Sequence, residues 1–165
     1  MAIDALTTLA TLVGNALKNR DASLTAAESC TGGGVAEAVT RISGSSSWFE
    51  RGFVTYSDAS KTEMLGVDQT VLDRYGAVSE ETARAMASGA LAHSRASIAL
   101  AVTGVAGPTG GSADKPVGTV CFAWAERGYD PKGETMHFGG NREAVRRQSA
   151  IHALQGVLRL LDKAL

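Results

Sequence analysis

The stretch that decides the fold is IALAVTGVAGPTGGS, residues 98–112. Its first five residues, 98–102, are almost continuously apolar, which is typical of a central strand that is covered on both faces. A long loop rich in glycine, proline and serine follows, from Thr103 to Pro116. In open α/β sheets, ligands bind in the crevice beyond the carboxyl ends of the strands. The stretch therefore predicts a buried strand followed by a loop that lines a binding site.

Helical and strand-like patterns alternate on both sides of this stretch. We expect helices over residues 1–20 and 35–42, from Ser57 or Asp58 to Leu65, from Ser79 to about 94, and from Asn141 onward. We expect further strands over residues 24–27, 49–56, 117–124 and 134–138, with the last two as neighbours. This order predicts an α/β fold, a three-layer α/β/α sandwich with a mixed, mostly parallel sheet. We expect residues 1–165 to form a single domain.

Composition excludes several classes of protein. The net charge is −1 and the sequence pI is about 6.3, which argues against a nucleic-acid partner because such proteins carry a basic face. Residues 1–20 lack the basic region of a signal peptide, and no run approaches the roughly 20 apolar residues of a membrane span, so we expect a cytoplasmic protein with no membrane partner. Cys30 and Cys121 do not have the spacing of metal ligands, so we expect no metal and no other cofactor.

The segment 28–34, ESCTGGG, leads from a strand into a helix. A helix N-terminus offers unpaired N–H groups, which suit a phosphate or the oxyanion that forms when a serine attacks a carbonyl. A glycine triplet alone more often makes only a tight turn. The segment matches neither the glycine patterns of dinucleotide and ATP sites nor the G-x-S-x-G elbow around a nucleophilic serine.

A nucleophilic Ser29 would need a base. The three histidines fall within expected helices or a strand, where a structural or surface role is the better interpretation. A lysine can replace histidine if burial or a nearby positive charge lowers its pKa. Lys61 is the candidate, but its spacing from Ser29 alone does not establish a pair. Cys30 stays a rival nucleophile, because thiolates are stronger nucleophiles than hydroxyls.

Four blocks of the chain together resemble the CinA C-terminal domain family, whose enzymatic members are nicotinamide-mononucleotide amidohydrolases. The blocks are AESCTGGGVAEAV (27–39), SGSSSWFERGFVTYSDASKTEMLGV (43–67), GAVSEETARAMASGAL (76–91) and ALAVTGVAGPTGGSADKPVGTVCFAW (99–124). They occur in the right order, and the resemblance covers most of residues 5–160. It implies an α/β/α sandwich, a stand-alone form of the domain and a homo-oligomer.

The resemblance also implies roles for individual residues. Ser29 corresponds to the nucleophile, Lys61 to the general base, and Tyr56 could join the proton relay, while Thr103 is expected to complete the catalytic group. Arg142 matches the arginine that meets the substrate phosphate. The other positions expected to bind the substrate are Cys30, Thr31, Gly32, Ser45, Gly104 and Gly107.

The resemblance implies hydrolysis of the carboxamide of nicotinamide mononucleotide to nicotinic acid mononucleotide and ammonia, in pyridine nucleotide recycling. The alternative is a non-catalytic regulatory module that binds a nucleotide or phosphate with the same loops. A role in DNA uptake or repair has no support from the near-neutral charge.

Overall fold

The computed structural model describes residues 2 and 4–162. A five-stranded sheet forms the centre, with the strand order β2-β1-β3-β4-β5. The strands are β1 (Leu24–Glu28), β2 (Phe49–Val54), β3 (Ile98–Gly104), β4 (Thr119–Glu126) and β5 (Lys132–His137). β1 is parallel to β2 and β3, whereas β3–β4 and β4–β5 are antiparallel pairs. The predicted mixed sheet is confirmed, and β4 and β5 are the expected neighbours.

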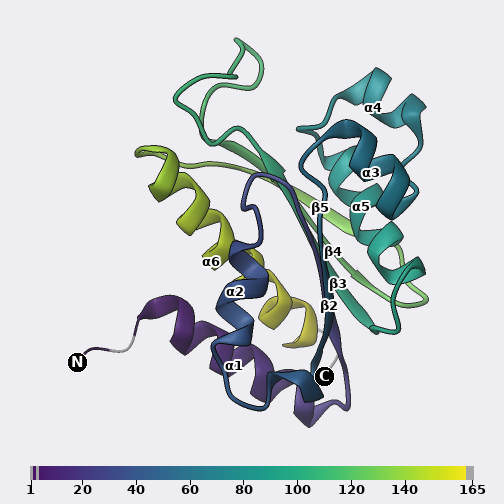
Figure 1. Cartoon of the computed structure of the whole chain (residues 1–165), viewed down its shortest axis with the longest axis vertical. Helices are drawn as coiled ribbons and strands as arrows, with labels where there is room; N and C mark the ends of the chain where they lie inside the picture. Colours follow the sequence, from purple (N-terminus) through teal and green to yellow (C-terminus); the bar gives the residue numbers. More distant parts are fainter. Residues whose placement is uncertain (1, 3, 163–165) are drawn as a thin grey trace.

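Helices cover both faces of the sheet, which confirms the α/β/α sandwich (Figure 1). One face carries α1 (Ala5–Asn19), α2 (Gly34–Thr40) and α6 (Arg142–Asp162). The other carries α3 (Asp58–Leu65), α4 (Gln69–Tyr75) and α5 (Glu80–Ala92). In the described part of the chain, no helix combines the length and the apolar character needed to cross a membrane.

The two faces differ in side-chain size, as β3 shows. Ile98, Leu100 and Val102 point into the core under α1, α2 and α6, while Ala99 and Ala101 face α5. Successive side chains of a strand alternate between faces, so one apolar run supplies both cores. The small alanines let α5 lie close to the sheet. Because α3 packs against α5, the position of α5 also determines the position of α3.

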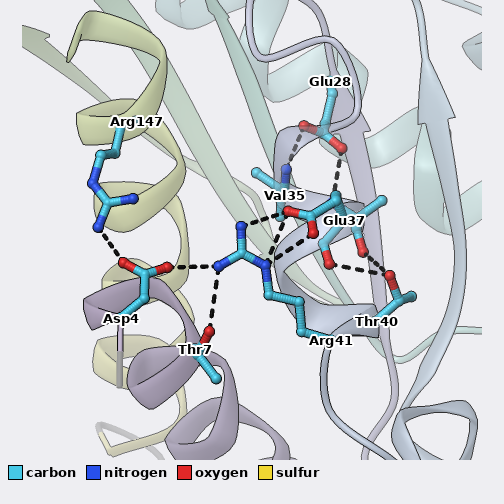
Figure 2. Close-up of polar contacts among 9 residues, drawn as sticks. Asp4, Thr7, Glu28, Val35, Glu37, Thr40, Arg41 and Arg147 are labelled. Carbon is cyan, nitrogen blue, oxygen red and sulfur yellow. Dashed lines mark hydrogen bonds and ion pairs between the residues drawn. The ribbon is translucent and has the colours of Figure 1, made fainter. Parts of the chain in front are cut away.

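The three helices of the first face are tied together at Asp4, just before α1 (Figure 2). Its carboxylate accepts a hydrogen bond from Arg41, at the end of α2, at 2.6 Å, and another from Arg147 of α6. Arg41 also pairs with Glu37 at 2.7 Å. Because these side chains are partly exposed, we assign the network a role in orienting the helices rather than a large contribution to stability.

Most expected helix starts are confirmed. The Oγ of Ser79 accepts a hydrogen bond from the amide of Thr82, and Asn141 caps α6 through the amide of Ala144 at 2.9 Å. Ser57, rather than Asp58, caps α3.

An additional helix and shifted strand starts are among the differences from expectation, and the ends of α2 and of the strands also differ by one or two residues. The short helix α4 was not expected, since Leu72 is its only buried residue and no apolar stripe marks it. β4 begins at Thr119 rather than Val117, because Gly118 adopts a positive φ of 95° and interrupts the extended chain. β5 begins two residues earlier than expected, at Lys132.

Candidate active site

Ser29 lies directly beyond the carboxyl end of β1, in the centre of the sheet. Its backbone N–H donates to the carbonyl of Val102 in β3 at 2.9 Å, which fixes the residue beside the neighbouring strand end. The Nζ atom of Lys61 in α3 lies 3.1 Å from the Oγ of Ser29 and 2.9 Å from the carbonyl oxygen of Thr55. The structure therefore brings the expected nucleophile and base within hydrogen-bonding distance.

Lys61 is almost completely buried, with 1% of its surface exposed. Burial disfavours the charged ammonium and lowers the pKa of Lys61, while the nearby Asp58 carboxylate partly opposes that shift. A neutral amine beside the Ser29 hydroxyl can accept its proton. The direction of this pKa shift is the one that a lysine base requires.

The start of α3 aims Lys61 at Ser29. Ser57 and Ser60 form a reciprocal capping box, in which each hydroxyl accepts a hydrogen bond from the other's backbone N–H at 3.1 Å. Just before it, the N–H of Thr55 donates to the carbonyl of Glu28 at 2.8 Å. This bond ties the entrance of α3 to the end of β1, where the nucleophile begins.

Glu28 is a buried carboxylate whose role the sequence did not reveal. Its Oε1 accepts a hydrogen bond from the hydroxyl of Thr31 at 2.6 Å and its Oε2 accepts one from the N–H of Ala36 at 3.0 Å. Its Oε1 also accepts a hydrogen bond from the N–H of Val35 at 2.8 Å (Figure 2). The carboxylate thus occupies the N-terminus of α2. Of the alternatives left open for this helix start, the structure does not favour a phosphate, because the amides of Val35 and Ala36 are already bound to Glu28.

Arg146 of α6 stabilises the turn after Ser29 through hydrogen bonds to its backbone. Its Nε and Nη2 donate to the carbonyls of Cys30 and Thr31, each at 3.2 Å. Together with Glu28, these bonds fix the peptide groups that follow Ser29. The amide of Cys30 has no acceptor in another described residue, so it is free to donate to a ligand beside Ser29.

A cavity of about 280 Å³ opens at Ser29 and Lys61. The expected site residues that line it are Ser29, Cys30, Tyr56, Lys61, Thr103, Gly104, Gly107 and Arg142. Asp58, Ala77 and Val78 also line the cavity and were not expected, whereas Val105, Ala106, Thr109 and Gly110 belong to the loop from Thr103 to Pro116 that was expected to line a site. The loop after β3 is thus a wall of the site, as its position beyond a strand end suggested.

Three expected substrate-binding residues do not line this cavity. The hydroxyl of Thr31 is bound to Glu28, and Gly32 faces Arg146. Ser45 lies in the short 3-10 helix Ser45–Ser47 that follows α2 and precedes β2, so it sits beyond the amino ends of the strands. Within one chain the structure does not bring Ser45 to the site, because α2 carries the backbone away from the carboxyl edge.

Arg142 and Tyr56 meet at the edge of the cavity. One guanidinium nitrogen of Arg142 donates to the Tyr56 hydroxyl at 2.9 Å, and the other donates to the carbonyl of Gly107 at 2.9 Å. Thr103 is buried and its hydroxyl donates to the carbonyl of Ala77 at 2.9 Å. Thr103 therefore joins two cavity walls, while Arg142 keeps further N–H donors for an anionic group.

Cys30 also lines the cavity, but its thiol is buried and packs in the apolar core. Burial raises the pKa of the Cys30 thiol to about 12, so little thiolate exists near neutral pH. Both cysteines are free. In the part of the chain that the structure describes, no group of three or more histidine, cysteine, aspartate or glutamate residues is placed to hold a metal ion.

Comparisons with known proteins agree on one family. Residues 6–161 match the family model described as the CinA C-terminal domain. The chain is 56% identical over 158 residues to the nicotinamide-nucleotide amidohydrolase PncC of Pseudomonas putida, covering 96% of this chain and 98% of that protein. It is 54% identical over 143 residues to the PncC of Escherichia coli K12, covering 87% of each chain.

A solved structure shows the same fold. The competence/damage inducible protein of Agrobacterium tumefaciens superimposes with a TM-score of 0.92 at 42% sequence identity. The match covers 98% of this chain and 99% of that one, so the sheet and both helical layers correspond.

Proposed function

The chain belongs to the CinA C-terminal domain family, and from that premise we propose that it hydrolyses the carboxamide of nicotinamide mononucleotide to nicotinic acid mononucleotide and ammonia. The observation that carries this proposal is the 3.1 Å contact between Ser29 and Lys61 at the floor of the cavity. A serine activated by a buried lysine is suited to acyl transfer from an amide.

The reaction proceeds in two stages. The neutral amine of Lys61 takes the proton of the Ser29 hydroxyl, and the Oγ attacks the carboxamide carbon. The Cys30 amide, which has no acceptor in another described residue, stabilises the oxyanion. The C–N bond breaks, the leaving ammonia takes the proton from Lys61, and an ester on Ser29 remains. Lys61 then takes a proton from a water molecule that attacks the ester carbon, the bond to the Ser29 oxygen breaks as Lys61 returns the proton to that oxygen, and the nicotinic acid product leaves as its carboxylate.

The edge residues hold the rest of the substrate. Arg142 binds the phosphate through the guanidinium donors that Tyr56 and Gly107 leave free. Tyr56 is 59% exposed, and its hydroxyl orients Arg142 toward the cavity. This assignment places the phosphate at the edge and the carboxamide at Ser29.

The decisive test is ammonia release from the purified protein with nicotinamide mononucleotide, beside Ser29→Ala. Release by the wild type and none by a folded variant supports both the reaction and the nucleophile. Equal release by both excludes Ser29 as the nucleophile. Binding of the nucleotide without ammonia release by the wild type favours a non-catalytic module instead.

We further propose a cytoplasmic homo-oligomer that acts without nucleic acid. Large apolar side chains are exposed on the described surface, with Val54 46% and Val117 40% exposed, and such groups favour contacts between subunits. Light scattering on the purified protein tests the oligomeric state, and a monomer at all concentrations would exclude it.

A further inference from the structure

Three side chains that line the cavity carry a charge at neutral pH in their ordinary form: Asp58, Lys61 and Arg142. Asp58 is the only carboxylate among the lining residues. It is exposed, and its carboxylate makes no hydrogen bond or ion pair with any other described residue. The fold does not use this group as a cap either, since the Ser57 hydroxyl caps α3.

Some acidic side chains of the protein are bound by cations: Asp4 pairs with Arg41 and Arg147, and Glu50 pairs with Arg51 at 2.7 Å. Others, such as Glu63, are exposed and make no pair with a described residue, so the position of Asp58 at the cavity is what distinguishes it. Asp58 lies one turn before Lys61 on the same helix, so its carboxylate is at the cavity that holds the reacting serine. A carboxylate at the cavity that no described side chain neutralises offers a negative charge complementary to a cationic ligand.

The chemistry of the proposed substrate supplies such a cation. The pyridinium ring of nicotinamide mononucleotide carries a positive charge next to the carboxamide, and the phosphate at its other end is negative. With a neutral Lys61, the cavity offers one negative group, Asp58, and one positive group, Arg142. We infer that Asp58 is a specificity-determining residue that selects amides attached to a positively charged ring. This inference rests on the proposed function and deepens it.

The pairing also links substrate recognition to the base. The charged or titratable groups that act on Lys61 are Asp58, on its own helix, and Cys30, in the turn that faces it. The Asp58 carboxylate stabilises the ammonium form of Lys61. While the cavity is empty, it therefore reduces the fraction of Lys61 that is in the neutral form needed to act as a base. A ring cation beside Asp58 cancels that effect, so the correct substrate favours the reactive amine.

The test compares nicotinamide mononucleotide with its reduced form. The two share the carboxamide, ribose and phosphate, but the dihydropyridine ring of the reduced form is neutral. Dissociation constants are measured by calorimetry on the folded protein in a Ser29→Ala background, where no turnover occurs. For Asp58→Asn we expect about tenfold weaker binding of the oxidised nucleotide, and a change of less than about twofold for the reduced one.

Glu63→Gln is the matched control. Glu63 lies on the same helix, is exposed and does not line the cavity, so the same loss of charge should change neither dissociation constant. Equal weakening of both nucleotides by Asp58→Asn, or no weakening of either, would overturn the inference. Failure of the proposed function is seen separately, as the absence of ammonia release by the wild type.

Discussion

The Oγ of Ser29 and the Nζ of Lys61 lie 3.1 Å apart, although 32 positions separate them in the sequence. Ser29 follows β1 and is held by its hydrogen bond to Val102 of β3, whereas Lys61 lies on α3, in the helical layer that also contains α4 and α5. Burial lowers the pKa of the Lys61 amine below its usual value. In the proposed mechanism, the reactivity of Ser29 therefore depends on the protonation state of a lysine in another layer of the fold.

The first prediction concerns pH. The pKa of Lys61 lies below its usual value of 10.5 because the amine is buried. Only the neutral amine accepts the serine proton, so kcat/KM should rise with pH through this lowered pKa and then level off above it. Steady-state rates across neutral to alkaline pH measure the midpoint. A midpoint at or above 10.5, or a rate that falls as pH rises, would contradict the assignment of Lys61 as base.

The second prediction separates the two candidate nucleophiles. Ser29→Ala should lower kcat by about three orders of magnitude or more, since the covalent step is lost. Cys30→Ala should keep most of the turnover, because its buried thiol holds its proton near neutral pH. Circular dichroism on both variants checks the fold. If Cys30→Ala is the inactive variant and Ser29→Ala is active, the assignments must be exchanged.

The sequence was a good guide where a pattern reflects packing. The apolar run at β3 predicted a strand covered on both faces, and it is one. The short helix α4 was not predicted, because Leu72 is its only buried residue and its apolar residues therefore show no helical periodicity. The position of Lys61 beside Ser29 followed only from the family resemblance, since spacing along a chain does not show which layers meet.

The sequence was a poor guide to buried polar groups. Glu28 was expected only as the first residue of the segment 28–34, and nothing in its neighbours showed that it would turn inward to cap α2. Asp58 was weighed only as a helix cap, although it lines the cavity. Ser45 belongs to a family motif, yet within one chain it lies beyond the other end of the strands. Such outcomes depend on three-dimensional partners that a linear pattern does not name.

The third prediction tests the turn that carries Ser29. Glu28→Gln replaces one acceptor oxygen by an N–H₂ group, which must face a donor such as the amide of Ala36. We expect a loss of about 2–3 kcal/mol in the free energy of unfolding, measured by urea denaturation. Glu37→Gln, in α2 but exposed, should cost about 0.5 kcal/mol or less. Equal losses in the two variants would show that the Glu28 contacts contribute little.

The fourth prediction concerns the phosphate. Arg142→Ala should raise the KM for nicotinamide mononucleotide by about tenfold or more, and should change the KM for the phosphate-free riboside by less than about twofold. Arg147→Ala is the matched control, since Arg147 lies on the same helix but outside the cavity. If Arg142→Ala changes both substrates alike, Arg142 shapes the cavity instead of binding the phosphate.

The fifth prediction links the packing of the second layer to the base. A Cβ atom added at Gly89 of α5 would lie 2.0 Å from the carbonyl oxygen of Leu65, at the end of the helix that carries Lys61. Because a backbone atom cannot yield as a side chain can, Gly89→Ala should push α3 away from α5 and should move Lys61 relative to Ser29. We expect a loss of about 2–3 kcal/mol in the free energy of unfolding, together with a lower kcat.

Gly139→Ala is the control for this change, since nothing lies within 4 Å of the added Cβ there. It should alter the free energy of unfolding by about 0.5 kcal/mol or less and leave kcat unchanged. Urea denaturation and ammonia release on both variants supply the two readouts. A Gly89→Ala variant that loses stability but keeps its full kcat would mean that α3 can shift without moving the Lys61 amine, and that the position of the base does not depend on this contact.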